Sequence, residues 1–182
     1  MGEGIVEKLK KEFDIAVEWT GVEIHPETPP EGRPLTELYR AADIERMMKH
    51  IREMGTAFGI GFADRPFLSN SRPALQAAEF ARERGPFGQF HSALFSAYFS
   101  QGLDIGDLEI LAQIARDSNL DADAMLDAVR SGTYLPRLHH AQQEAARLGV
   151  TGVPTFFIGA GKSVVGAQPL DVFRKVLRSV KT

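Results

Sequence analysis

The sequence predicts an α/β protein in which helices and strands at both ends of the chain flank a long all-helical block. Three observations predict this. Apolar and polar residues alternate over residues 15–20, which is typical of a strand with one buried face. From residue 35 to about residue 132 the apolar residues recur at helical spacing instead. Residues 148–169 have the pattern of a helix end, a strand, a tight turn, a second strand and the start of a last helix.

The composition is that of an ordinary soluble domain without any thiol chemistry. Of the 182 residues, 43% are hydrophobic and 25% are charged, which is usual for globular proteins. The net charge of −3 comes without a concentrated basic stretch, so the sequence predicts neither nucleic acid nor an anionic membrane as a partner. No run is long enough for a membrane span and the first residues lack the apolar centre of a secretory signal, so we expect a cytoplasmic protein.

The N-terminal elements follow from two different periodicities. Ile5, Val6, Leu9 and Phe13 recur at helical spacing and predict an amphipathic helix of about ten residues. The alternation over residues 15–20 then predicts a strand. Four prolines within residues 25–34 predict an extended loop, because proline can neither continue a helix nor donate to a strand ladder.

The central block is predicted to contain several helices joined by short loops. Residues 35–58 indicate one long helix or two shorter ones. Ser71 is a candidate cap for a helix with Pro73 in its first turn, and residues 107–118 and 121–130 begin with acidic residues that suit a helix N-terminus. The helix that follows Ser71 is expected to carry a stripe of small residues for close packing, formed by Ala74, Ala77, Ala78 and Ala81. The bulkiest apolar face is formed by Phe90, Leu94, Phe95, Tyr98 and Phe99.

The C-terminal stretch has the most specific pattern. Gly149 lies where a helix is expected to end in a left-handed cap. Pro154 precedes a short apolar run at residues 155–158, so it should open an edge strand or lie in a special turn. Residues 159–162 predict a four-residue hairpin loop, residues 163–165 the return strand, and residues 170–180 a final amphipathic helix.

This order of elements resembles the second half of a thioredoxin-like domain. In detail it is similar to the DsbA-like oxidoreductases, especially the FrnE-like and 2-hydroxychromene-2-carboxylate isomerase-like subgroup. Its most specific parts are residues 148–169, the Gly-Leu-Asp-Ile-Gly-Asp-Leu stretch at residues 102–108 and the Pro-Pro-Glu-Gly-Arg loop at residues 29–33. The resemblance implies a discontinuous thioredoxin-like domain of residues 1–34 and 138–182, with a helical insertion domain of residues 35–137.

The resemblance also implies a substrate-binding loop. In the family the peptide bond before the matching proline is cis, and the loop faces the redox site. Gly152, Val153 and Pro154 are the residues that match this loop, so we expect them to bind an extended peptide or a thiol substrate. Whether the bond before Pro154 is cis cannot be predicted from the sequence.

The other half of the family site has no counterpart here. Family members begin with a strand and a Cys-x-x-Cys motif at the N-terminus of the first core helix, where the helix dipole lowers the pKa of the attacking thiol. In this chain that helix begins at about Gly4, so both would precede Met1, and the cysteine count is zero. We therefore assign no catalytic residue and expect no disulfide exchange. We favour the explanation that the sequence starts at an internal methionine of a longer reading frame. The alternatives are a sheet that is closed by another chain or by direct strand pairing, and a redox-dead homologue.

The remaining chemistry-bearing residues predict no metal site and no further catalytic group. The adjacent His139 and His140 point in different directions on a helix, so they are not a metal pair. His25 is expected to be a loop residue. The glycines of residues 159–162 lack the spacing of a phosphate loop and no helix follows them directly.

Three functional hypotheses remain open at this point. The first is a DsbA-like thiol–disulfide oxidoreductase family member that is inactive as it stands. The second is a glutathione-dependent isomerase or transferase of the kappa or 2-hydroxychromene-2-carboxylate type, since these resemble the same fold but use serine in place of cysteine. The third is a non-catalytic module that docks an extended peptide by strand addition. This last hypothesis includes a homodimer through an open sheet edge at residues 15–20.

Overall fold

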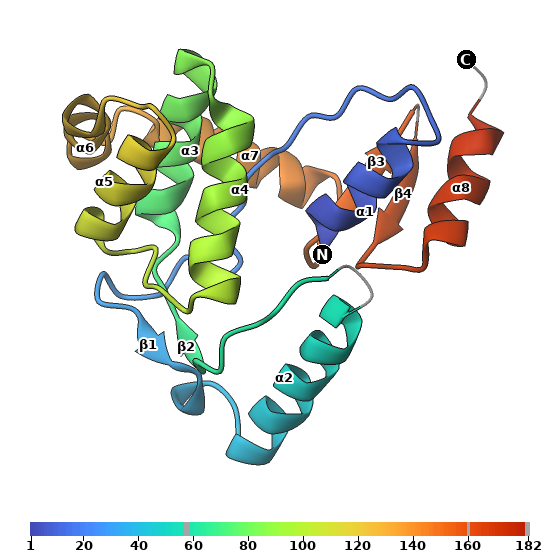
Figure 1. Ribbon diagram of the computed structural model, residues 1–182, viewed down its shortest axis with the longest axis horizontal. Helices are drawn as coiled ribbons and strands as arrows, with labels where there is room; N and C mark the ends of the chain where they lie inside the picture. The colour runs from blue at the N-terminus through green and yellow to red at the C-terminus, as the bar shows by residue number, and fades with distance from the viewer. Residues whose placement is uncertain (57–58, 160, 181–182) are drawn as a thin grey trace. The chain divides into compact units, whose positions relative to one another are not determined.

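The computed structural model describes residues 1–56, 59–159 and 161–180 (Figure 1). The chain forms two compact units, one of Met1–Thr20 with Gln143–Thr182 and one of Gly21–Gln142. Helix α7, Leu135–Arg147, belongs to both. No helix of the described residues is long and apolar enough to cross a membrane.

These boundaries differ from the predicted division at residues 34/35 and 137/138, because the chain after Thr20 is bound to helix α3, Arg72–Arg84. Arg72 donates from Nε to Glu23 over 3.0 Å, and Asn70, just before the helix, donates from Nδ2 to the carbonyl oxygen of Thr28 over 2.9 Å. The Pro-rich segment therefore belongs to the same compact unit as the helices.

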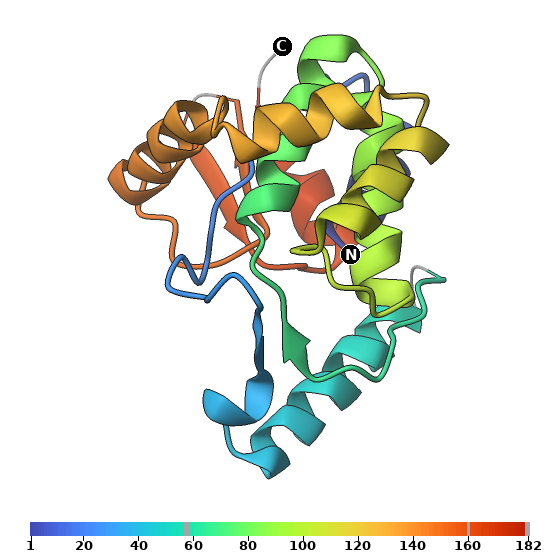
Figure 2. The same ribbon diagram turned by 90° about the vertical axis from the view of Figure 1, so that its left-hand side faces the viewer.

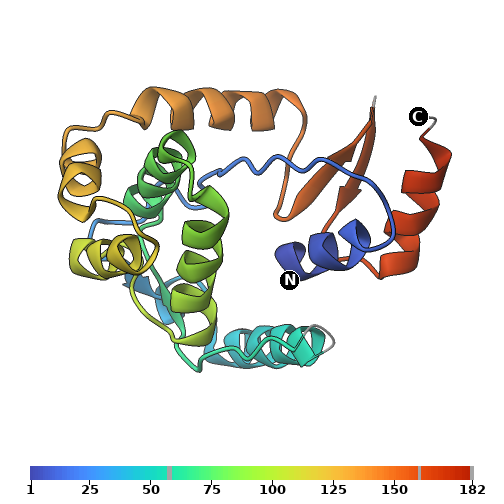
Figure 3. The same cartoon turned by 45° about the horizontal axis from the view of Figure 1, so that its top comes forward.

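The first unit contains helix α1, Gly2–Lys10, strand β3, Thr155–Ile158, strand β4, Lys162–Val165, and helix α8, Leu170–Ser179. β3 and β4 form an antiparallel hairpin in which Thr155 lies opposite Val165 and Ile158 lies opposite Lys162 (Figure 3). The predicted hairpin is present, although β4 begins one residue earlier than expected, at Lys162. Ala160, in the predicted loop, lies outside the described residues.

One face of the hairpin packs on the helices of this unit. Phe173 of α8 is fully buried and meets Phe156 of β3 edge to face, with ring centroids 4.8 Å apart. Ile5, Leu9 and Val164 are also buried in the unit. Burying a side chain of this size contributes roughly 2–3 kcal/mol, so a few residues account for much of the stability of this small unit. The amphipathic N-terminal helix predicted from its spacing is confirmed.

The strand predicted at residues 15–20 is wrong. The backbone there forms no ladder, and the strands that the structure describes pair only as β1 with β2 and β3 with β4. A strand is stable only when its N–H and C=O groups pair with a neighbour, which alternation along one segment does not guarantee. Ile15 and Trp19 are half-buried and Val17 is exposed, so the alternating burial is present although no strand forms.

The second unit contains the helical block. Its longer elements are α2, Ala41–Thr56, α3, α4, Phe87–Phe95, a π-helical turn η2, Ser96–Ser100, α5, Leu108–Asp117, and α6, Ala122–Arg130. A 3₁₀ turn η1, Leu35–Glu37, precedes α2, so residues 35–56 form two helical segments, while Phe58 lies outside the described residues. Strand β1, Arg33–Pro34, pairs with strand β2, Phe67–Leu68 (Figure 2). β1 lies at the end of the segment for which the sequence predicts an extended loop.

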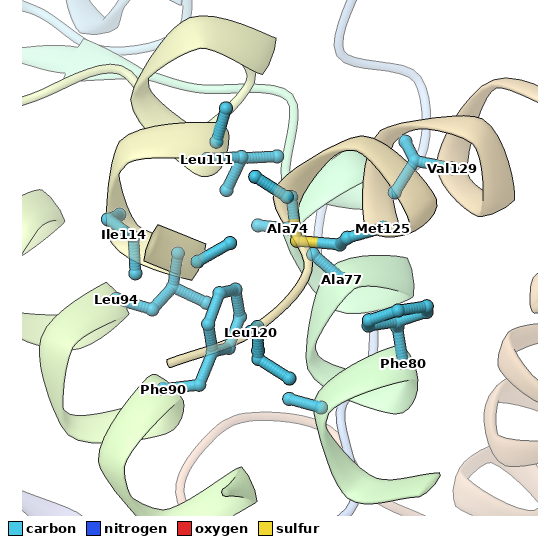
Figure 4. Close-up of a cluster of buried hydrophobic side chains, with 14 of the residues drawn as sticks. Ala74, Ala77, Phe80, Phe90, Leu94, Leu111, Ile114, Leu120, Met125 and Val129 are labelled. Atoms are coloured by element: carbon cyan, nitrogen blue, oxygen red, sulfur yellow. The ribbon is translucent and has the colours of Figure 1, made fainter. Parts of the chain in front are cut away.

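The core of the second unit lies between α3, α4, α5 and α6. Figure 4 shows the side chains that meet there, among them Ala74, Ala77, Phe80, Phe90, Leu94, Leu111, Met125 and Val129. The small-residue stripe on α3 is confirmed for Ala74, Ala77 and Ala81, which are buried. Asp107 and Asp121 cap α5 and α6 through their side chains, whereas Ser71 stands at the start of α3 without a side-chain cap bond.

Candidate functional site

The loop that opens the hairpin begins at the end of α7. Gly149 adopts φ +70°, the left-handed conformation predicted for a C-cap. Its N–H donates to the carbonyl oxygen of Ala146 over 3.0 Å, and Val150 donates to that of Ala145 over 2.9 Å. This pair of bonds is the Schellman motif, which ends the helix and directs the chain toward the hairpin.

The three predicted site residues lie together at the start of β3. The peptide bond between Val153 and Pro154 is cis. Thr155 donates from Oγ1 to the carbonyl oxygen of Gly152 over 2.7 Å, and Gly166 donates its N–H to the carbonyl oxygen of Pro154 over 2.8 Å. Both flanks of the loop are therefore tied to the hairpin.

Helix α1 packs on the inner side of this loop. A Cβ added to Gly2 would lie 3.4 Å from Cβ of Pro154 and 3.8 Å from the ring of Phe156. These are ordinary packing distances, so the proline ring rests against the first turn of α1. Val153, by contrast, is 56% exposed.

Val153 presents free backbone groups as well as an exposed side chain. Among the described residues, no hydrogen bond uses its N–H or its C=O. Residues 148–161 contain no charged residue, so these groups lie in an uncharged stretch. A backbone donor and acceptor on one exposed residue can pair with another extended chain without regard to its side chains.

Other residues of types that can catalyse reactions or bind metals have structural roles. Nδ1 of His25 donates to Oε1 of Glu27 over 3.1 Å at the surface, so His25 is a loop residue, as expected. His91 is buried between the rings of Phe87 and Phe95, with centroid distances of 5.3 Å and 4.5 Å. No group of three His, Asp or Glu side chains that could hold a metal ion occurs in the part of the chain that the structure describes.

Asn70 joins one loop to one helix within the second unit. Its Nδ2 donates to the carbonyl oxygen of Thr28, and its Oδ1 accepts the N–H of Arg72 over 3.0 Å. Because both capacities of the buried amide are used within its own unit, Asn70 orders the Pro-rich segment. Nothing in the sequence pattern indicates this role of Asn70.

One partly buried polar pair, between buried Tyr134 and exposed Glu83, has no signal in the sequence. Tyr134 donates its hydroxyl to Oε2 of Glu83 over 2.6 Å. Burial, together with this carboxylate, raises the pKa of Tyr134 to about 12. Arg137 forms an ion pair with the same carboxylate. The hydrogen bond from Tyr134 and then that from Arg137 lower the pKa of Glu83. The pair joins the end of α3 to the segment that precedes α7.

One hollow on the surface of α8 contains none of the three loop residues. It measures about 510 Å³ and is lined by Asp171, Arg174, Lys175 and Arg178 of α8. Arg174 is already paired with Glu12 and with Asp171, at 2.6 Å and 2.7 Å. The hollow is an open surface of α8, and the charge of Arg174 is neutralised by these two carboxylates. We therefore assign no ligand to it.

A helix that ends in a glycine cap, a cis-proline loop, an antiparallel hairpin and a closing helix together define the C-terminal half of a thioredoxin-like domain. The whole chain belongs to the family of the DSBA-like thioredoxin domain, whose model matches residues 1–178. The family predicted from residues 148–169 is confirmed, and so is the thioredoxin-like fold with a helical insertion.

Two solved structures and one relative extend this similarity. A probable DsbA oxidoreductase from Streptomyces coelicolor matches with a TM-score of 0.86 and 24% identity, over 97% of this chain and 81% of that chain. A 2-hydroxychromene-2-carboxylate isomerase matches with a TM-score of 0.78 and 15% identity, over 96% of this chain and 86% of that chain. The uncharacterized protein YwbO of Bacillus subtilis (strain 168) is 28% identical over 97% of this chain and 88% of its own length. The chain has no cysteine, so the dithiol chemistry of the family cannot come from its own residues.

Proposed function

We propose that this protein binds an extended peptide or a thiol-containing substrate at the loop of Gly152, Val153 and Pro154, and that it does not exchange disulfides. The observation that carries the proposal is the free backbone N–H and C=O of Val153, beside a proline that is packed on α1. Family membership supports the assignment of this loop to substrate binding.

The loop suits this role because it is already ordered. The bonds from Thr155 to Gly152 and from Gly166 to Pro154 hold both flanks of Val153. A ligand that pairs with an ordered backbone loses less free energy to the ordering of the protein. The recognition is independent of ligand sequence, apart from apolar contact with the exposed Val153 side chain.

The binding test uses a thiol-free extended peptide, the reduced and alkylated insulin B chain, in an NMR titration of ¹⁵N-labelled protein. We expect the amide signal of Val153 to move saturably. Val153→Pro removes the N–H and should weaken binding at least tenfold, whereas Val153→Ala keeps the backbone and should change it less than threefold. Equal affinity for wild-type and Val153→Pro protein would contradict the proposal.

The catalytic part of the proposal has its own test. A thiolate is required to attack a disulfide, and no cysteine is present. We therefore expect the insulin reduction rate with dithiothreitol to equal that of a control without protein. A rate reproducibly above this control would refute the statement that the chain is inactive in disulfide exchange.

Glutathione binding, as in a glutathione-dependent isomerase or transferase, is the second candidate. The structural similarity to a 2-hydroxychromene-2-carboxylate isomerase favours it. The backbone of Val153 could pair with the central residue of the tripeptide, but residues 148–161 offer no charged side chain to its two carboxylates. We therefore rank it below the extended peptide. A thermal-shift series at millimolar glutathione that leaves the melting temperature unchanged removes it.

The cytoplasmic location expected from the sequence belongs to this proposal. Fractionation of cells that express the chain with a C-terminal tag tests it directly. Recovery of the tagged protein outside the cytoplasmic fraction would contradict it.

A further inference from the structure

Four aromatic rings follow one another along helix α4 and the π-helical turn η2. They recur every four residues, at Phe87, His91, Phe95 and Phe99, and successive ring centroids are 5.3, 4.5 and 5.6 Å apart. A step of four residues in an α-helix passes a full turn by about 40°, so rings at this spacing gradually leave one line. A π-helical turn holds more residues, and η2 therefore brings Phe99 back toward the line of the row.

The same turn positions a further ring, that of Phe62, at the end of the row. The carbonyl oxygen of Phe99 accepts the N–H of Ala63 over 2.8 Å, so the segment that contains Phe62 lies beside η2. The ring of Phe62 meets that of Phe99 edge to face, with centroids 5.7 Å apart and ring planes at 72°. Phe62, Phe95 and Phe99 thus form two walls that meet at an angle, and we call them the aromatic corner.

The aromatic corner is held in place by its neighbours. Tyr98 meets Phe99 edge to face with centroids 4.9 Å apart, and its hydroxyl donates to the carbonyl oxygen of Phe67 over 3.3 Å. Phe95 and Phe99 nevertheless remain 38% exposed. Exposed rings that are already ordered can pack against one more ring with little further loss of side-chain entropy.

The surroundings of the corner favour neither sign of charge. Residues 85–103 contain no Asp, Glu, Lys or Arg. Asp64, which lies two residues after Phe62, donates no net charge because it is paired with Arg52 over 3.2 Å. Burial raises the pKa of Tyr98, while Asp104 and Arg65 act on that pKa in opposite directions. A charged ligand would lose its hydration without gaining a partner, so these surroundings suit an uncharged one.

We propose that the aromatic corner binds a small, planar, uncharged aromatic molecule, which packs against Phe95 and Phe99 beside Phe62. Three side chains present the area of a single ring system, whereas a stable protein interface takes about 20–30 residues on each side. A free small molecule therefore fits the corner better than a protein surface does. The corner lies in the second unit and uses none of the loop residues Gly152, Val153 and Pro154, so the inference goes beyond the proposed function.

The test uses indole, which is planar and uncharged, as the probe. We expect saturable shifts of the Phe95 and Phe99 amide signals in an NMR titration of ¹⁵N-labelled protein, with nuclear Overhauser effects between indole and both rings. A ligand of this size should have a dissociation constant of roughly 1–10 mM. Indole-3-acetate and tryptamine add a negative and a positive charge to the same ring, and each should bind at least about threefold more weakly. Cyclohexanol, which is uncharged but has no aromatic ring, should bind at least about fivefold more weakly.

Three variants test the residues of the corner. Phe95→Leu removes one ring at an exposed position and should weaken indole binding at least about fivefold, whereas Phe95→Trp keeps a ring and should stay within about twofold. Tyr39→Leu is the matched control, because Tyr39 is an exposed aromatic residue of the same unit outside the corner, and its affinity should not change. Circular dichroism confirms that the variants are folded before they are compared.

Each other result overturns the inference. Absence of saturable shifts, tighter binding of a charged analogue, or equal losses in Phe95→Leu and Tyr39→Leu would exclude a site for uncharged aromatic molecules at the corner. Tighter binding of the capped tripeptide acetyl-Gly-Trp-Gly-amide than of indole would make an aromatic side chain of another polypeptide the occupant. A dimer in sedimentation that Phe95→Leu dissociates and indole leaves intact would make a second copy the occupant. We expect indole binding to be unchanged in Val153→Pro, and its loss there would contradict a site independent of the loop.

Discussion

Replacement of Phe173 by alanine tests whether the first unit depends on the contact between α8 and the hairpin. Phe173 is fully buried and packs edge to face on Phe156 of β3. Truncation of a buried phenylalanine costs about 3–5 kcal/mol, and an aromatic pair contributes about 0.5–1.5 kcal/mol beyond its buried area. We expect a loss of about 4 kcal/mol in the free energy of unfolding of this unit.

Urea denaturation followed by Trp19 fluorescence measures this loss, because Trp19 lies within the same compact unit. Val172→Ala is the matched control on the same helix. Val172 is 39% exposed, so its truncation should change the stability by no more than about 0.5 kcal/mol. A loss below about 1 kcal/mol for Phe173→Ala, or equal losses for both variants, would refute the account of the core of this unit.

Two further predictions concern the second unit. Gly32 has φ +70°, and an added Cβ would lie 2.5 Å from the Phe67 ring. Gly32→Ala should therefore destabilise the protein by at least about 2 kcal/mol in urea denaturation. Gly88→Ala is the control, because Gly88 has open space around it, and it should be neutral or stabilising by up to about 1 kcal/mol. The raised pKa of Tyr134 means that its neutral form is favoured in the folded state. The stability that it contributes is therefore complete below pH 10 and should be lost as the pH rises toward about 12, and Tyr134→Phe should remove that part of the alkaline loss in pH-dependent melting curves.

Much of the architecture could be predicted because its causes are local. Helix α5 follows the aspartate that caps it, and α7 ends at Gly149, where a left-handed residue is required. The hairpin of β3 and β4 follows from a short apolar run, a glycine-containing turn and a return strand. Each of these patterns is completed by residues close to one another in the chain.

The predicted strand at residues 15–20 shows where local information ends. Its alternation is genuine, but a ladder requires a second strand, and none of the described residues supplies one. The exposure of Phe95 and Phe99 could not be predicted either. Both belong to the bulkiest apolar face of the sequence, yet each is 38% exposed, whereas Phe90 and Leu94 are buried.

The sequence by itself determined the family, the loop of Gly152, Val153 and Pro154, and the absence of thiol chemistry, because these depend on residue type and spacing along the chain. The tertiary structure decided which backbone groups are free. Val153 presents its free N–H and C=O, while Nε2 of Gln168 occupies the carbonyl oxygen of Val165. The hydrogen bonds of a strand pair depend on register, and register exists only once the two strands lie side by side.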